Sequence, residues 1–178
     1  MTRAATCSCG GRLKRATLDE VDLAPLFGLR GVLTGPIPGL RCDTCGEATF
    51  EGAMLERMLI AVARSVLSQP RILTAEEARF LRKAVLGLTQ ERLAKRMAIH
   101  AITVADWERG ERPLSKEHDY ELRGVALSSL MEWTRSGGGR KLDALGEDVA
   151  RILTAPRTLA PPRRPKRYVV PASEMPAA

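Results

Sequence analysis

A mainly α-helical protein with a small β-rich module at its N-terminal end is the fold class that the 178-residue sequence predicts. Three observations lead to this prediction. All four cysteines lie within the first 45 residues, among short β-favouring stretches broken by Gly and Pro. From Leu55 onward, apolar residues recur at the three- and four-residue spacing of amphipathic helices. From Pro156 onward the chain is rich in Pro and Arg.

The charge is unevenly distributed along the chain. In total, 28 Lys and Arg face 21 Asp and Glu, which gives a net charge of +7 and favours a polyanionic partner. Residues 1–52 carry six charges of each sign, so the surplus lies entirely in residues 53–178. Aromatic residues make up only 4%, which argues against stacking of bases on an aromatic sheet. No apolar run reaches the ~20 residues of a membrane helix and no secretory signal is visible, so we expect a cytoplasmic protein without a membrane partner.

Residues 1–52 are predicted to form a zinc-binding module. Cys7 and Cys9 form one tight pair, and Cys42 and Cys45 form another. Zinc in structural sites prefers four thiolates in tetrahedral arrangement, so we expect one structural Zn²⁺ per chain. Gly46 favours a turn after the second pair, whereas the one-residue spacer of the first pair requires the following glycines to bend the chain.

The cysteines leave other readings open. Four reduced thiols without metal, two disulfides and a redox-active Cys42–Cys45 pair are the alternatives, although disulfides are disfavoured in the cytoplasm. A catalytic zinc is not expected, because four thiolates leave no position for water. The sequence also has no readable Ser/His/Asp or Cys/His arrangement and no phosphate-binding glycine loop, so we do not expect an enzyme.

A linker helix and a helical domain follow the module. Residues 53–70 contain a predicted helix from Ala53 to Leu67 that ends before Pro70. Residues 71–133 form the helical domain, which opens with a capping-box sequence from Thr74 to Glu77. Residues 134–178 are predicted to be a flexible, basic, Pro-rich tail, whose run from Arg163 to Arg167 either binds DNA nonspecifically or only aids solubility.

Residues 89–110 have the pattern of a helix-turn-helix motif. Two short helices meet at a tight turn, with a small residue, Ala94, where they approach each other. The residues that are expected to fix the crossing of the helices are apolar: Leu93, Ala94, Met97, Ile99, Val104 and Trp107. In such a motif the second helix enters the major groove of double-stranded DNA.

The motif resembles the lambda-repressor-like (XRE) helix-turn-helix family. The resemblance rests on Thr89-Gln90-Glu91, on Leu93-Ala94 and on Trp107-Glu108-Arg109-Gly110. Together with Cys42-Asp-Thr-Cys-Gly-Glu47, the arrangement is similar to the MqsA/YgiT-type antitoxins, which join a zinc-bearing module to a DNA-binding domain. The resemblance implies a homodimer formed through the C-terminal domain, autoregulatory operator binding and a cognate toxin as a partner.

We therefore expect a sequence-specific transcriptional regulator, a repressor and the antitoxin of a toxin–antitoxin pair. The candidate DNA contacts lie on the motif: Thr89, Gln90, His100, Ala101, Ile102, Thr103, Asp106 and Arg109. Ile102 could touch a thymine methyl group, and Asp106 could accept a hydrogen bond from cytosine. Because family members often carry polar or basic residues at these two positions, the alternative is a protein-interaction adaptor whose helical domain dimerises without reading DNA.

Overall fold

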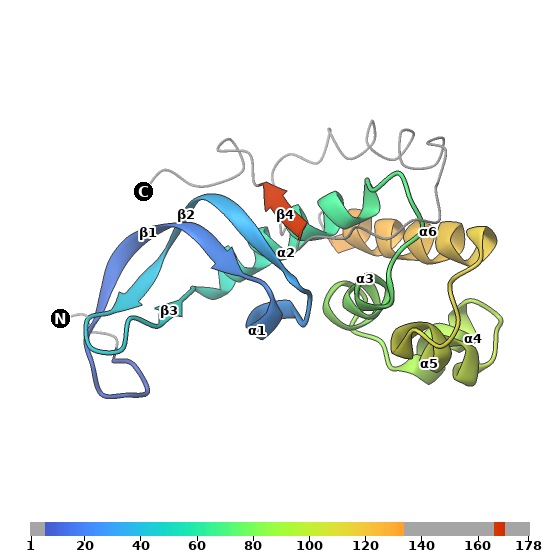
Figure 1. Cartoon of the computed structure of the whole chain (residues 1–178), viewed down its shortest axis with the longest axis horizontal. Coiled ribbons are helices and arrows are strands. Elements are labelled where there is room, and N and C mark those ends of the chain that lie inside the picture. Colours follow the sequence, from blue (N-terminus) through green and yellow to red (C-terminus); the bar gives the residue numbers. More distant parts are fainter. Residues whose placement is uncertain (1–5, 134–165, 170–178) are drawn as a thin grey trace.

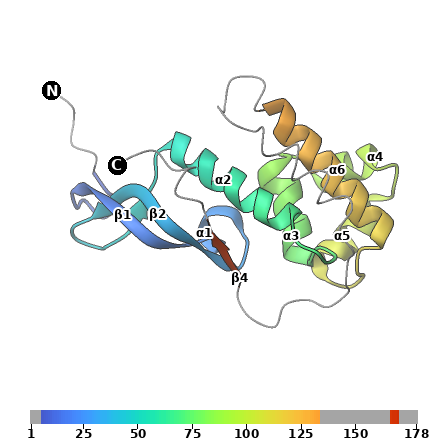
Figure 2. The ribbon, with the colours of Figure 1, turned by 90° about the horizontal axis from the view of Figure 1, so that it is seen from above.

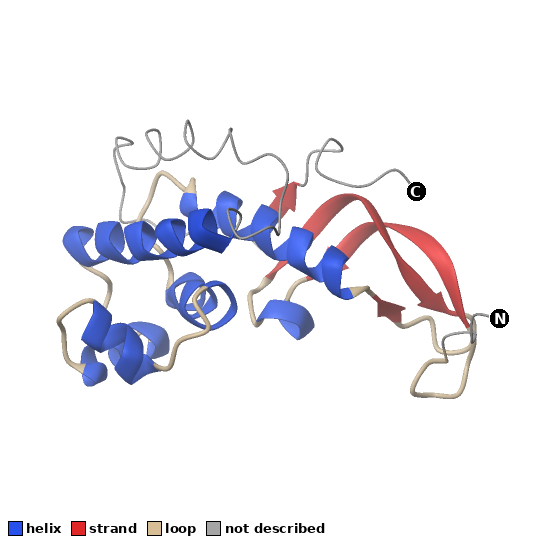
Figure 3. Cartoon of the chain, turned by 180° about the vertical axis from the view of Figure 1, so that it is seen from behind, coloured by secondary structure: helices blue, strands red, loops and turns tan. Residues whose placement is uncertain are grey.

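The molecule is elongated, with a strand-rich half and a helical half joined by helix α2 (Figure 1). The computed structural model describes residues 6–133 and 166–169. Strands and helices segregate into the two halves, as the colouring by secondary structure shows (Figure 3). The predicted fold class, a small β module followed by a helical domain, is thereby confirmed.

The N-terminal half is built on a long antiparallel hairpin. Its elements in chain order are β1 (Leu13–Asp22), α1 (Ala24–Phe27), β2 (Gly31–Cys42) and β3 (Ala48–Thr49). The register places Leu13 opposite Cys42 and shifts at a bulge between Leu18 and Glu20. The short helix α1 ends at Gly28, whose φ of 64° is left-handed and suits glycine. Because β1 begins where β2 ends, the hairpin brings the two cysteine-bearing segments to the same end of the sheet.

Helix α2 (Gly52–Leu67) lies along the sheet and continues into the helical half, as Figure 2 shows from above. It begins one residue before the predicted start at Ala53. It packs in the same core as Leu33 and Ile37 of β2. Met54, Met58, Val62 and Val66 are buried at the predicted four-residue spacing, and Ala61, Ala63 and Leu67 widen the buried face.

The helical half contains the helix that begins at the predicted capping box and the two helices of the predicted motif, followed by a long helix. The elements are α3 (Ala75–Phe80), the π-helical turn η1 (Leu81–Val85), α4 (Gln90–Arg96), α5 (Ala101–Arg109) and α6 (Lys116–Trp133). The capping box is formed, since the backbone NH of Glu77 donates to Thr74 Oγ1 at 3.3 Å and the NH of Thr74 donates to Glu77 Oε2 at 2.9 Å. None of the described helices is long and apolar enough to cross a membrane.

The two halves share one continuous core of buried side chains. Phe27 of α1 packs edge-on against Phe80 of α3, with ring centroids 6.1 Å apart. Nearby, Arg30 Nε lies 2.5 Å from Glu76 Oε1, a pair too exposed to contribute much stability. The β module therefore packs directly against the helical domain, besides being connected to it by α2.

A fully buried arginine holds the end of α2. The guanidinium of Arg123, on α6, donates to the carbonyl oxygens of Val66 and Arg71 at 3.1 and 2.6 Å and to that of Leu67. Its Nε lies 3.0 Å from Asp119 Oδ2, one turn earlier on α6. Carbonyls at the end of a helix lack partners within it, so Arg123 satisfies these groups and joins α2 to α6.

The prediction of a flexible tail was wrong at Lys166–Val169. These residues form strand β4, which pairs in parallel with the start of β2 (Figure 1). Tyr168 is 1% exposed and lies in the main core, and its carbonyl accepts a hydrogen bond from Thr34 Oγ1 at 3.2 Å. Burial of this large ring stabilises a segment whose flanking Pro and Arg residues suggested disorder. Most of the predicted tail, including Arg163 to Pro165, lies outside the described residues.

Candidate metal centre and nucleic-acid interface

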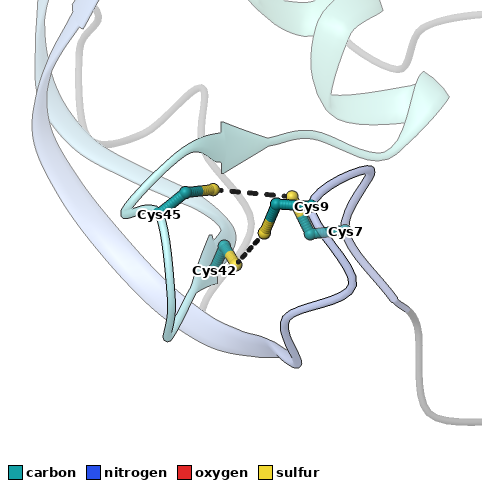
Figure 4. A group of neighbouring side chains, drawn as sticks. All are labelled: Cys7, Cys9, Cys42 and Cys45. Atoms are coloured by element: carbon teal, nitrogen blue, oxygen red, sulfur yellow. Dashed lines mark hydrogen bonds between the residues drawn. The ribbon is translucent and has the colours of Figure 1, made fainter.

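Two turns bring the cysteine pairs together at one end of the sheet (Figure 4). In the first turn, the NH of Cys7 donates to the carbonyl of Gly11, and the NH of Gly10 donates to that of Cys7, both at 2.9 Å. In the second, the NH of Gly46 donates to the carbonyl of Cys42 at 3.1 Å. Gly10 and Gly46 have φ values of 85° and 73°, which glycine adopts without strain.

Asp43 ties the two turns to each other. Its Oδ1 accepts a hydrogen bond from the backbone NH of Arg12 at 3.0 Å, and its own NH donates to the carbonyl of Arg12 at 3.1 Å. Its other oxygen lies 3.3 Å from Lys14 Nζ. The hydrogen bond from Arg12 and then the pairing with Lys14 hold the pKa of Asp43 below its usual range. The cysteine pairs are therefore held in place by bonds that do not involve sulfur.

The four sulfur atoms converge on one point. Cys7 and Cys45 have their Sγ atoms 3.7 Å apart, and Cys9 and Cys42 have theirs 3.5 Å apart. All four lie within 4.8 Å of one another. Zinc–sulfur bonds of about 2.3 Å in a tetrahedron require sulfur separations of about 3.8 Å. The predicted convergence of Cys7, Cys9, Cys42 and Cys45 is confirmed, and the cluster has the dimensions of a metal site.

Backbone NH groups bond to the sulfur atoms of the cluster, and a glycine leaves room for them. The NH of Gly11 donates to Cys9 Sγ, and the NH of Thr44 donates to Cys42 Sγ, both at 3.4 Å. Such bonds stabilise thiolate sulfur and orient it. A Cβ on Gly11 would lie 2.5 Å from Cys42 Sγ, closer than atoms can approach. Glycine at this position allows the one-residue spacer to turn without obstructing the site.

The thiols differ in acidity. Hydrogen bonds from the backbone NH groups of Cys45 and Thr44 lower the pKa of Cys42 to about 6. For Cys45 the NH of Glu47 acts to lower the pKa, but the bonds with Cys9 and Cys42 outweigh it and raise the pKa to about 12. Thiolates crowded in one cluster repel each other, and a cation at their centre would offset this repulsion.

The helix-turn-helix motif forms as predicted from α4, a tight turn and α5. The NH of Ile99 donates to the carbonyl of Ala94 at 2.9 Å across the turn, in which Ala98 has a left-handed φ of 50°. Ala94 is 2% exposed, so the helices approach closely where the sequence places a small residue. The other predicted packing residues are buried, except for the half-buried Ile99: Leu93, Met97, Val104 and Trp107.

A buried ion pair, which the sequence analysis did not foresee, fixes α5. Arg82 of η1 forms two bonds to Glu108, Nε to Oε1 at 2.5 Å and Nη2 to Oε2 at 2.7 Å. Gln90 Nε2 also donates to Glu108 Oε2 at 2.9 Å, which joins α4 to the pair. Burial acts to raise the pKa of Glu108, but the hydrogen bonds from Arg82 and Gln90 and the charges of Arg82 and Arg79 together outweigh it and leave the pKa below its usual range. Because such side chains are usually exposed, no sequence pattern indicates this pair.

The predicted DNA contacts all belong to the motif or its caps. Thr89 caps α4, since its Oγ1 accepts a hydrogen bond from the NH of Arg92 at 3.2 Å. His100 precedes α5, but its side chain makes no capping bond. Gln90 is turned toward Glu108, whereas Ile102 is 62% exposed. The remaining candidates lie along α5: Ala101, Thr103, Asp106 and Arg109. DNA contact by any of the eight stays a prediction.

The charged groups on the exposed side of α5 pair with each other. Arg109 Nη2 lies 2.5 Å from Asp106 Oδ1, and Arg109 also forms two 2.8 Å bonds to Glu111. The other exposed cations of the motif are on α4: Arg92, Lys95 and Arg96. The motif therefore separates an α5 whose exposed cation is paired with two carboxylates from a basic α4.

Comparison with protein families supports the helical half directly. Residues 79–118 match the helix-turn-helix family and form an XRE-type helix-turn-helix domain. The match covers α4, α5 and their connecting turn. Comparisons with curated proteins and with solved structures give no significant match. The domain is that of a DNA-binding regulator, and the cysteine cluster adds a potential metal centre in the same chain.

Proposed function

We propose that this chain is a homodimeric, sequence-specific transcriptional repressor of the cytoplasm that carries one structural zinc ion per chain. The observation that carries the proposal is the helix-turn-helix domain, in which α5 is supported from behind by the Arg82–Glu108 pair. A helix held in this way can enter the major groove without being reordered on binding. Repression follows if the operator overlaps the promoter, because bound protein excludes RNA polymerase.

The basic residues of α4 suit the phosphate backbone. Arg92, Lys95 and Arg96 are exposed one element away from α5. When a protein neutralises phosphates it releases counterions, so affinity falls as salt rises. We assign affinity mainly to these cations, whereas sequence preference comes from the exposed side of α5.

The four thiolates are proposed to hold zinc. A closed tetrahedral set of sulfur ligands suits zinc or iron, and the backbone NH groups at sulfur suit the thiolates that either metal requires. The ion would be bound by Cys7, Cys9, Cys42 and Cys45. It would cross-link the two turns and would have no catalytic role. The proposal is thus of a binding protein and not of an enzyme.

Titration of the full chain against DNA from upstream of its own gene tests the DNA-binding proposal. Fluorescence anisotropy at about 0.15 M salt is expected to show binding at least ~10³-fold tighter than to a scrambled duplex. Gln90→Ala and Arg109→Ala should weaken it, the latter also because Asp106 and Glu111 would then face phosphates unpaired. Arg57→Ala, an exposed position on α2, is the matched control. Equal affinity for both duplexes would contradict the proposal.

An antitoxin role is the narrower part of the proposal. It rests on the resemblance of the cysteine unit and the motif to the MqsA/YgiT-type antitoxins. In that role the β module would bind the cognate toxin, and the complex would repress its own promoter. Coexpression with the protein encoded by the adjacent gene, followed by copurification, tests it. An adjacent product that neither binds this chain nor inhibits growth would contradict it.

The second candidate is a protein-interaction adaptor. The pairing of Arg109 with Asp106 and Glu111 favours it, because a recognition helix usually presents a free cation. In this case the helical domain would dimerise and the β module would bind a partner. Light scattering that shows a dimer, together with no preference for any duplex, would distinguish the adaptor from the repressor.

A further inference from the structure

The exposed side of α5 is apolar over its first turns. Ile102 is 62% exposed, and among the described residues only Tyr120 and Val169 are also large apolar side chains with high exposure. Ala101 and Ala105 lie beside it and are half-buried. On a helix, residues three and four apart lie next to each other, so these three side chains form one surface at the N-terminal end of α5. That end of a recognition helix is the part that reaches base edges.

Two charged side chains of α5, Asp106 and Arg109, are already engaged. Arg109 uses Nε and Nη2 for its two bonds to Glu111, and Nη2 also bonds to Asp106. Bidentate recognition of guanine requires two donors on one edge of a guanidinium, and the edge formed by Nε and Nη2 of Arg109 is occupied. Asp106, which could otherwise accept a bond from cytosine, is directed to Arg109. Polar readout through this edge of Arg109 or through Asp106 Oδ1 would therefore require these bonds to break first.

We infer that α5 reads the C5-methyl groups of pyrimidines in the major groove, with Ile102 as the main contact. This inference rests on the proposed function and specifies what the same interface recognises. The thymine methyl is the only apolar group that the unmodified base pairs present in the major groove. An apolar surface flanked by paired charges complements it, whereas the other base edges present donors and acceptors that such a surface leaves unsatisfied.

The positive charge beside this surface favours DNA as its partner. Arg92, Lys95 and Arg96 of α4 are exposed, and their positive charge matches the phosphates on either side of the groove. The apolar side of α5 itself offers little net charge, so it would not hold DNA alone. Affinity and readout are thus divided between the two helices of the motif, which allows each to be tested separately.

Two chemical sources could supply the methyl group, thymine and 5-methylcytosine. The experiment uses the full chain with its metal and a duplex selected by that chain from random sequences. Each thymine of the selected site is replaced in turn by uracil, which lacks only the methyl group. Each T·A pair is also replaced by C·G with and without 5-methylation, so that the two sources are compared at the same position.

Loss of one methyl contact is expected to weaken binding about fourfold for each thymine beneath α5. In Ile102→Ala the difference between thymine and uracil should disappear, while Val169→Ala, an equally exposed apolar position on β4, should keep it. Lys95→Ala should weaken binding to both duplexes by the same factor. Tighter binding to 5-methylcytosine than to thymine would support the readout and identify methylated cytosine as its source.

The outcomes separate this inference from the proposed function. Sequence-specific binding that is unchanged by uracil at every position, in wild type and in Ile102→Ala, would overturn the methyl readout and leave the repressor proposal intact. Absence of preference among all selected and scrambled duplexes would overturn the repressor proposal itself. Because Ile102 is exposed, its substitution should leave the thermal unfolding midpoint unchanged, and this measurement accompanies the titrations.

Discussion

Arg82 and Glu108 form a buried bidentate ion pair that attaches the recognition helix α5 to η1. The side chains are 6% and 3% exposed, so neither charge has water available if the other is removed. The backbone carbonyl of Leu88 accepts a further bond from Arg82 Nη1 at 2.7 Å. The pair therefore joins three segments of the helix-turn-helix domain, and the position of α5 depends on it.

Removal of one partner of this ion pair should lower the stability of the domain strongly. Glu108→Leu leaves Arg82 buried and unpaired, and the expected loss is about 3–5 kcal/mol in the free energy of unfolding. Arg82→Met combined with Glu108→Leu should recover part of this loss, because two apolar groups then replace two charges. Urea denaturation measures the wild type, Glu108→Leu, Arg82→Met and the double variant. As a control, Glu111→Gln breaks an exposed pair and should change stability little. Additive losses in the double variant would refute the coupling.

Acid should weaken the domain through the same pair. The pKa of Glu108 is lowered from an ordinary value of 4.5, so the unfolded chain binds a proton at higher pH than the folded one. The stabilisation is therefore complete above about pH 4.5 and is lost as pH falls below it. Urea unfolding between pH 7 and pH 3 should show this decline. Glu108→Gln, although less stable at pH 7, should decline less steeply, and a parallel decline would exclude Glu108 as the titrating group.

Metal content is the direct measure of the cysteine cluster. Elemental analysis of protein purified without added metal is expected to find about one zinc per chain. Cys42→Ser should lose it, because serine is a poor zinc ligand and Cys42 is the thiol with a lowered pKa. Ser8→Ala, within the first turn, should retain it. A metal-free protein whose β module is fully folded would contradict the zinc assignment.

Two adjacent glycines provide a sharper test of the site's geometry. Gly11→Ala should reduce zinc occupancy, because the added Cβ would lie 2.5 Å from Cys42 Sγ. Gly10 has a left-handed φ of 85° but open space around it, so Gly10→Asn should retain zinc with a stability loss of about 1 kcal/mol or less. Competition with a chromogenic chelator measures both affinities. Equal affinity in the two variants would show that the close approach to sulfur is relieved by movement of the turn.

Strand β4 can be tested through its aromatic residue. Tyr168→Ala removes a ring that is 1% exposed and should cost about 3–5 kcal/mol. Tyr168→Phe should be neutral or stabilising, because the hydroxyl is buried without a hydrogen-bond partner among the described residues. Val169→Ala, 68% exposed, should change little. Thermal unfolding measures the series. If Tyr168→Ala unfolded like the wild type, β4 would not be part of the stable core.

Local patterns in the sequence predicted most of the fold. The extent of α2, the capping box at Thr74 and the turn between α4 and α5 depend on residues a few positions apart, so spacing alone reveals them. The convergence of the cysteines could be predicted as well, because few arrangements other than a metal site explain two tight pairs.

Contacts between distant charged residues could not be predicted. Arg123 and Glu108 look like exposed positions of amphipathic helices, and their burial depends on partners far away in the sequence. Tyr168 lies close to a Pro- and Arg-rich run, whose composition suggests disorder. In each case composition indicates solvent exposure, and only tertiary packing shows otherwise.

The pairing of β4 with β2 has a consequence for biosynthesis. During translation β1 and β2 emerge from the ribosome early. The strand that pairs with Gly31–Thr34 is translated only after the whole helix-turn-helix domain. The nascent sheet therefore has an exposed edge and an unfilled core position until residue 169 has left the exit tunnel. Chains released before that point would carry an incomplete sheet, which makes them preferred substrates for proteases and chaperones.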